Sequence, residues 1–145
     1  MLRTALYLML ARACGVLPHT QSVPTACVRS EPDTVQLVGR LERHMFFGAP
    51  TYGENPRTDT RETGFYLALA SPICSAGGSD PARNDARTGV RRIQLVLDAT
   101  GYARLRPFLG QRIALRGTMF ASFTGHHHAP LLLTVLTPVR VSARP

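Results

Sequence analysis

Three consecutive histidines, His126, His127 and His128, lie in a short turn at residues 124–130 and are the residues best suited to chemistry. In an extended segment successive side chains alternate, so we expect His126 and His128 to share one side and His127 to point the other way. Two imidazoles at this spacing can bind zinc or another divalent metal if a third ligand is available. The rings can instead pin the turn by hydrogen bonds, or form a contact surface that titrates at about pH 6–7.

The groups that could assist these histidines lie in a polar stretch, Gly48 to Gly64, of 17 residues without periodicity. Long loops of this kind in small domains are usually functional. The candidates for a third metal ligand are Glu54, Asp59, Glu62 and His44. For a ligand-binding site we expect Tyr52, Glu54 and Asp59 beside the three histidines, because their side chains can donate or accept hydrogen bonds to imidazole. We expect His126 and His128 to be the ligands of any metal, and no other cofactor.

Other catalytic arrangements are not found in the sequence. It contains no Gly-x-Ser-x-Gly nucleophile elbow, no glycine-rich phosphate loop and no metalloprotease helix motif. We therefore expect a protein that is not an enzyme and has no catalytic residues.

The turn is flanked by two strand-like runs, Arg112 to Phe123 and Leu131 to Val141. In the first run Ile113, Leu115, Gly117 and Met119 alternate with more polar residues, which is the period of a half-buried strand. We therefore expect Leu115, Gly117 and Met119 to face the protein interior.

Three further strands and a helix precede this region. The strands are expected at 34–47, 65–70 and 90–97. A short helix is expected at 98–109, capped by Asp98 or Thr100, divided into two turns by Pro107 and ended by Gly110. Gly39, inside the first strand, suggests a bulge or a tight bend.

The order of elements, three strands, a helix and two strands, predicts an all-β fold. It is the order of the OB-fold, a five-stranded Greek-key barrel with a helix at one end. The loop between strands one and two and the loop between strands four and five lie on the same rim of that barrel. We therefore expect the 48–64 loop and the histidine turn to meet.

The charge of the chain invites a nucleic-acid interpretation. The chain has 145 residues, enough for one domain, and a formal net charge of +8. All 17 basic residues are arginines and they are scattered along the chain, which favours an ordinary solvated surface over a basic patch. Phe120, Phe123 and Tyr66 could stack on bases in an OB barrel, although packing is the commoner fate of such aromatics.

The first 26 residues resemble a signal peptide, with Arg3 near the start, an apolar run from Thr4 to Ala11 and small residues before residue 27. We therefore expect residues 27–145 to form the mature domain, in the periplasm or secreted. No apolar run reaches the roughly 18–20 residues that a membrane-spanning helix needs. Removing the signal leaves Cys27 and Cys74, which form a disulfide or remain two buried thiols.

Several motifs also carry a family resemblance. They are Arg116 to Ala121, Thr124 to Leu133, Gly39-Arg40-Leu41, Phe47 to Tyr52, Pro72-Ile73-Cys74, Ile93 to Leu97 and Tyr102 to Gly110. Together they resemble a family of small exported bacterial proteins of unknown function with a Gly-Thr-x-Phe…Thr-Gly-His-His-His signature. The resemblance implies export and a Cys27–Cys74 disulfide, and it implies no particular activity.

These observations favour a secreted or periplasmic binding or inhibitory module whose site is the rim formed by the histidine turn and the 48–64 loop. We expect its partner to be a protein or an envelope component, and not a nucleic acid. The alternatives are a nucleic-acid-binding OB domain, which the charge would favour, and a metal-dependent hydrolase that uses the histidines.

Overall fold

The computed structural model describes residues 27–78, 80 and 84–139, so the predicted signal peptide at residues 1–26 lies outside the described residues. Within this part of the chain the strands are β1 (Thr34–Phe47), β2 (Arg61–Ser75), β3 (Arg87–Val96), β4 (Arg112–Ala121) and β5 (Leu131–Val139). A short helix, α1 (Ala99–Leu105), and a 3-10 turn, η1 (Arg106–Phe108), join β3 to β4.

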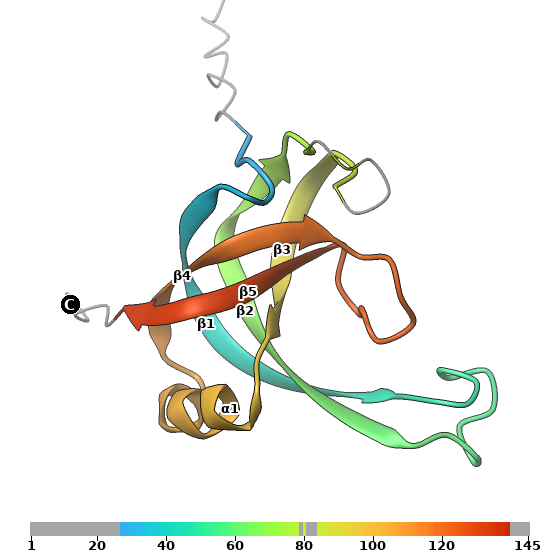
Figure 1. Cartoon of the computed structure of the whole chain (residues 1–145). Coiled ribbons are helices and arrows are strands. Elements are labelled where there is room, and N and C mark those ends of the chain that lie inside the picture. Colours follow the sequence, from blue (N-terminus) through green and yellow to red (C-terminus); the bar gives the residue numbers. More distant parts are fainter. Residues whose placement is uncertain (1–26, 79, 81–83, 140–145) are drawn as a thin grey trace, which may run out of the picture.

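The strands close into a single barrel in the order β1-β2-β3-β5-β4, with β4 pairing back onto β1 (Figure 1). Neighbouring strands are antiparallel except for β3 and β5, which are parallel. This closure, with the helix between β3 and β4, is the Greek-key topology of the OB-fold. The predicted fold class is therefore confirmed.

The alternation in β4 places the expected residues inside the barrel. Leu115 and Met119 are fully buried in the core. Gly117 lies between them where β4 and β5 shift register, and a Cβ at this position would overlap the carbonyl of Thr134. A glycine is therefore required at this position for the two strands to approach so closely.

The helix forms as two short pieces, as the position of Pro107 predicts. The Asp98 carboxylate caps α1 by accepting a hydrogen bond from the backbone N–H of Gly101 at 2.6 Å. Leu105, at the end of α1, is buried against the barrel core. Pro107 lies in η1, and Gly110 has a φ of +80°, which turns the chain into β4. The helix thus covers one end of the barrel.

The second strand is much longer than the predicted 65–70. At its start, residues 61–64 pair with residues 44–47 of β1, so the connecting loop spans 48–60 and not 48–64. At its end the strand continues past Pro72, because the pairing with β3 is irregular between Ala68 and Ile73 and a bulge accepts proline. Smaller corrections apply to β3, which begins at Arg87, and β4, which ends at Ala121.

A disulfide joins Cys27 to Cys74 and ties the start of the described chain to the end of β2. The predicted pairing is therefore confirmed, and two free thiols are excluded. Beside it, the backbone N–H of Val28 donates to the carbonyl of Cys74 at 2.8 Å. None of the helices in the described part of the chain is long and apolar enough to cross a membrane.

Candidate functional site

The β1–β2 hairpin extends beyond the barrel and ends in residues 48–60, here called the hairpin loop (Figure 1). This loop is organised by Asp59. Its carboxylate accepts hydrogen bonds from the backbone N–H and hydroxyl of Thr51, both at 2.8 Å, and from the N–H of Gly53 at 2.6 Å. Desolvation opposes the ionised form, but these three donors outweigh it and lower the pKa of Asp59. Asp59 therefore holds the loop together.

Residues 122–130, here called the histidine loop, are pinned partly by His127. The Nδ1 atom of His127 accepts a hydrogen bond from the backbone N–H of Phe123 at 3.0 Å, and its ring packs edge-on against Phe120 and Phe123. Desolvation and the neighbouring His126 and His128 lower the pKa of His127. The neutral ring is thus favoured, and it pins the turn.

Gln94 of β3 clamps the histidine loop to the barrel. Its side-chain amide donates to the carbonyl of His126 at 2.9 Å and accepts from the backbone N–H of His128 at 2.6 Å. The amide thus bonds to the loop backbone much as a neighbouring strand would. This arrangement fixes the two residues whose side chains face the hairpin.

Glu62, at the start of β2, joins the hairpin to the histidine loop. Its two carboxylate oxygens lie 2.7 Å from Nδ1 of His126 and 3.4 Å from Nε2 of His128. A carboxylate only accepts hydrogen bonds, so both imidazoles donate to it. A Cβ on Gly48 would overlap the Glu62 carboxylate. The absence of a side chain at Gly48 therefore provides the space that the carboxylate occupies.

Tyr52 makes the second link between the two loops. Its hydroxyl lies 3.3 Å from Nε2 of His126, and the two rings meet edge to face at 5.3 Å. A Cβ on Gly125 would lie only 3.0–3.1 Å from the Tyr52 ring, so the ring covers this glycine. Tyr52 has a φ of +51°, which a tyrosine seldom adopts. The two loops therefore meet, as the OB topology predicts.

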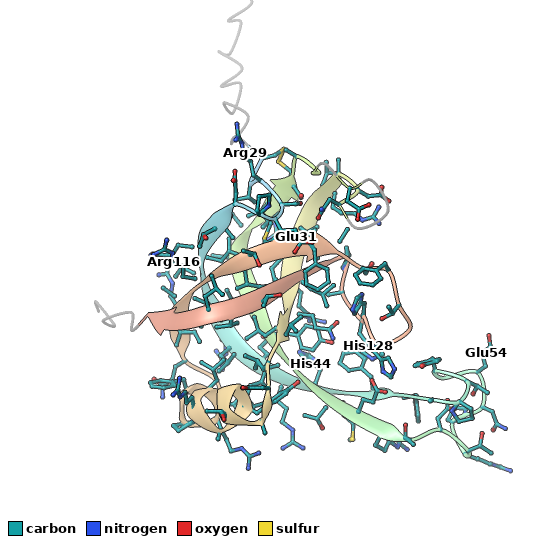
Figure 2. The ribbon with its side chains drawn as sticks, in the orientation of Figure 1. Arg29, Glu31, His44, Glu54, Arg116 and His128 are labelled. Carbon is teal, nitrogen blue, oxygen red and sulfur yellow. A yellow bond between two sulfur atoms is a disulfide. The ribbon has the colours of Figure 1, made fainter. Side chains whose placement is uncertain are left out.

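Aromatic rings lie beneath this polar network on the outer side of the barrel wall. The His128 ring stacks on the Phe46 ring, with 4.2 Å between the ring centroids and an angle of 4° between the planes. The centroids of the Phe46 and Tyr66 rings are 5.4 Å apart, and the Tyr66 and His44 rings meet edge to face with centroids 5.2 Å apart. Figure 2 shows His44 and His128 on the same side of the molecule. The histidine loop thus covers a small aromatic layer outside the main core.

The Tyr66 side chain is completely buried, and its hydroxyl has no hydrogen-bond partner among the described residues. Burial raises the pKa of Tyr66 far above its ordinary value, and the nearby Tyr102 adds to this effect. The hydroxyl lies beside Gly64, where a Cβ would be 3.3 Å from it. An unpaired buried hydroxyl is costly, so Tyr66 supports the fold through the contacts of its ring and not through its hydroxyl.

These elements enclose a pocket of about 260 Å³ on the rim. It is lined by Glu62, Thr63, Gly64, Gln94, Leu95, Val96, Leu97, Tyr102, His126, His127, His128 and Leu132. His126 is the most accessible member of the imidazole–carboxylate network, with 60% of its side chain exposed, whereas His128 has 16%. The pocket thus combines one exposed imidazole with partly buried polar groups and with the buried side chains of Leu95 and Leu132.

The structure brings some predicted site residues together and separates others. His126, His128 and Tyr52 meet at the rim, with His126 and His128 on one side and His127 on the other, as the alternation predicts. The carboxylate of Asp59 bonds to Thr51 and Gly53 within the hairpin loop and not to the histidines. Glu54 lies at the exposed tip, away from the histidines (Figure 2).

The sequence prediction of the site did not include Gln94 or Phe46, and it listed Glu62 only as a possible metal ligand. One signal was present for Gln94, because it is the single polar residue in the apolar run Ile93 to Leu97. Among the described residues no three His, Cys, Asp or Glu side chains are arranged to hold a metal ion. Metal binding by His126 and His128 therefore stays a prediction.

The fold and the rim together define a small OB-type barrel with an imidazole–carboxylate site between two loops. Residues 92–137 match the family model described as Domain of unknown function (DUF4431). This segment contains Gln94, α1 and the whole histidine loop, and its description names no activity. No curated protein and no solved structure matches the chain. The resemblance to a family of exported bacterial proteins stays a prediction.

Proposed function

We propose that this protein is an exported binding module that contacts a protein or envelope component through its rim. The observation that carries the proposal is the network in which Glu62 of β2 holds His126 and His128 of the histidine loop, because it joins the β1–β2 hairpin to that loop beside a pocket. Two members of the rim are exposed: Tyr52 has 43% of its surface exposed, and His126 has 60% of its side chain exposed. Exposed aromatic and imidazole groups of this kind are suited to contact a partner.

The anchors of the two loops support a binding role. Asp59 fixes the hairpin loop, and Gln94 and His127 fix the histidine loop, so the contact groups rest on backbone that is already ordered. A preorganised surface loses less conformational entropy when a partner binds.

Export is supported by the Cys27–Cys74 disulfide, since disulfides persist mainly in oxidising compartments. The nucleic-acid alternative has less support. Of the three aromatics considered as base-stacking platforms, Tyr66 and Phe120 are buried, and Phe123 is exposed. Base stacking needs accessible ring faces.

A photo-crosslinking amino acid in place of Tyr52, introduced in the native host, tests the proposal. We expect a discrete protein or envelope adduct from position 52. The matched control carries the same amino acid in place of Arg116, an exposed residue of β4 outside the site. That control should give no such adduct.

The decisive comparison is a second cross-linking strain that also carries His126→Ala and His128→Ala. We expect its adduct to fall at least tenfold. Equal adducts from positions 52 and 116, or an adduct insensitive to the histidine substitutions, would contradict the proposal. An adduct with nucleic acid would replace it by the nucleic-acid alternative, and stoichiometric zinc in protein purified from the host would favour the metal-dependent alternative.

A further inference from the structure

A second, larger pocket of about 510 Å³ lies between the β1–β2 hairpin and the helical segment. It is lined by Arg43, Thr63, Phe65, Ala99, Tyr102, Arg106 and Leu109. Figure 1 shows α1 at the end of the barrel from which the hairpin extends. Tyr102 and Thr63 line both this pocket and the rim pocket, and the Tyr102 hydroxyl donates to the carbonyl of Thr63 at 3.3 Å. Tyr102 thus forms a wall between the two.

The floor of this second pocket is apolar. Phe65 has only 2% of its surface exposed, and its ring meets that of Tyr102 edge to face at 4.9 Å. Leu109 is partly buried against the same core. Such a floor favours contact with a hydrocarbon chain or an aromatic ring.

Two arginines stand at the edges of this floor, Arg43 from β1 and Arg106 from η1. Neither guanidinium has an ion-pair or hydrogen-bond partner among the described residues, and no carboxylate lines the pocket. Three other arginines form ion pairs, Arg29 with Asp33, Arg87 with Asp85 and Arg92 with Glu42. Exposed arginines such as Arg57 and Arg116 also have no ion pair within the described part of the chain, but they do not line this pocket with its apolar floor. The pocket therefore has a local positive charge that the chain leaves uncompensated.

We infer that this pocket binds a small organic anion with an apolar body. The anionic group would lie between Arg43 and Arg106, since guanidinium groups bind carboxylates and phosphates by charge-assisted hydrogen bonds. The apolar body would lie on Phe65 and Leu109. A volume of about 510 Å³ is within the range of small-molecule sites. This inference does not depend on the rim site or on its partner.

Titration of the disulfide-bonded protein with three naphthalene probes, followed by backbone amide NMR, tests it. The probes are 2-naphthoate, 2-naphthyl phosphate and the uncharged 2-naphthamide. We expect one or both anions to shift the amide signals of Thr63, Ala99 and Leu109, and to bind at least tenfold more tightly than the amide. The tighter of the two anions identifies the ligand's headgroup as a carboxylate or a phosphate.

Variants separate this site from the rim. Arg43→Gln with Arg106→Gln should weaken binding of the anions at least tenfold, whereas the exposed control pair Arg57→Gln with Arg116→Gln should leave it unchanged. His126→Ala should also leave it unchanged, which keeps the inference distinguishable from the proposed rim function. Equal binding of naphthamide and naphthoate, equal loss in the control pair, or shifts confined to other parts of the barrel would overturn it.

Discussion

The interior of the barrel and its rim are held in different ways. In the interior, alternating apolar side chains from all five strands pack into one cluster. At the rim, single polar groups each fix one neighbour: Asp59 the hairpin loop, Gln94 the histidine loop, and Glu62 the two imidazoles. Substitutions in the interior should therefore change global stability, and those at the rim should change local order and binding.

The largest effect is expected at the centre of the interior. Leu115→Ala should lower the free energy of unfolding by about 2–5 kcal/mol, because the side chain is fully buried and its removal leaves a cavity. Chemical denaturation measures this loss. A change below about 0.5 kcal/mol, which is typical of a surface site, would show that the interior tolerates substitution as the rim does.

A smaller effect is expected from the clamp between the two regions. Gln94→Ala removes two hydrogen bonds to the histidine loop and should cost about 1–2 kcal/mol. Amide hydrogen exchange at His128 should accelerate more than exchange in β4. Gln36→Ala is a suitable control, because Gln36 is an exposed side chain on β1. Equal effects of the two substitutions would remove the special role of Gln94.

The double substitution His126→Ala with His128→Ala tests whether the rim is a contact surface or a structural support. We expect partner cross-linking to be lost while the free energy of unfolding falls by no more than about 1.5 kcal/mol, because His126 is exposed and the packed contact that is removed is the stacking of His128 on Phe46. Thermal or chemical denaturation measures the change in the free energy of unfolding. A loss of about 2–3 kcal/mol would instead show that these histidines pin the fold.

His127 should make the stability of the rim depend on pH, whereas the stability of the interior should not. Its pKa is lower in the folded protein than the ordinary value of 6.5, so the unfolded chain takes up the proton first as the pH falls. Stability from His127 is thus fully present above pH 6.5 and is lost as the pH falls through the folded pKa. Protonation at Nδ1 would also break the bond from Phe123.

His127→Asn provides the matched comparison, because an amide oxygen can replace Nδ1 as acceptor without titrating. The unfolding free energy of the wild type should fall relative to that of this variant as the pH falls below 6.5. A difference that stays constant from about pH 8 to pH 4, a range that includes the ordinary histidine pKa, would show that His127 does not contribute.

The smallest effect is expected at Tyr66. Tyr66→Phe should leave the free energy of unfolding unchanged or raise it by up to about 1 kcal/mol, because the buried hydroxyl has no partner among the described residues. A clear loss of stability would show that the hydroxyl makes a hydrogen bond in solution.

Much of the fold could be predicted because its interior follows a simple alternation. Ile113, Leu115 and Met119 carry the period of a strand, and Asp98 and Gly110 are helix-boundary residues whose roles are local. The start of β2 could not be predicted in this way. Residues 61–64 have no apolar alternation, since they pair with β1 beyond the barrel end and bury little.

The site was only partly predictable for a related reason. The alternation correctly separated His127 from His126 and His128, because that property depends on three adjacent residues. Glu62 and Gln94 are placed by strand pairing, at sequence separations of 64 for Glu62 and His126 and 32 for Gln94 and His126. No local pattern in the sequence reports contacts over such separations, so the hairpin acids could not be ranked.

The clamp formed by Gln94 has a consequence for how such a barrel could diversify. Both of its hydrogen bonds go to main-chain atoms, the carbonyl of residue 126 and the N–H of residue 128. Side chains at these two positions can therefore be exchanged without releasing the loop from β3. Related chains that keep the glutamine could present a different pair of side chains in the same place, and the histidine loop could serve as an insertion point for engineered recognition.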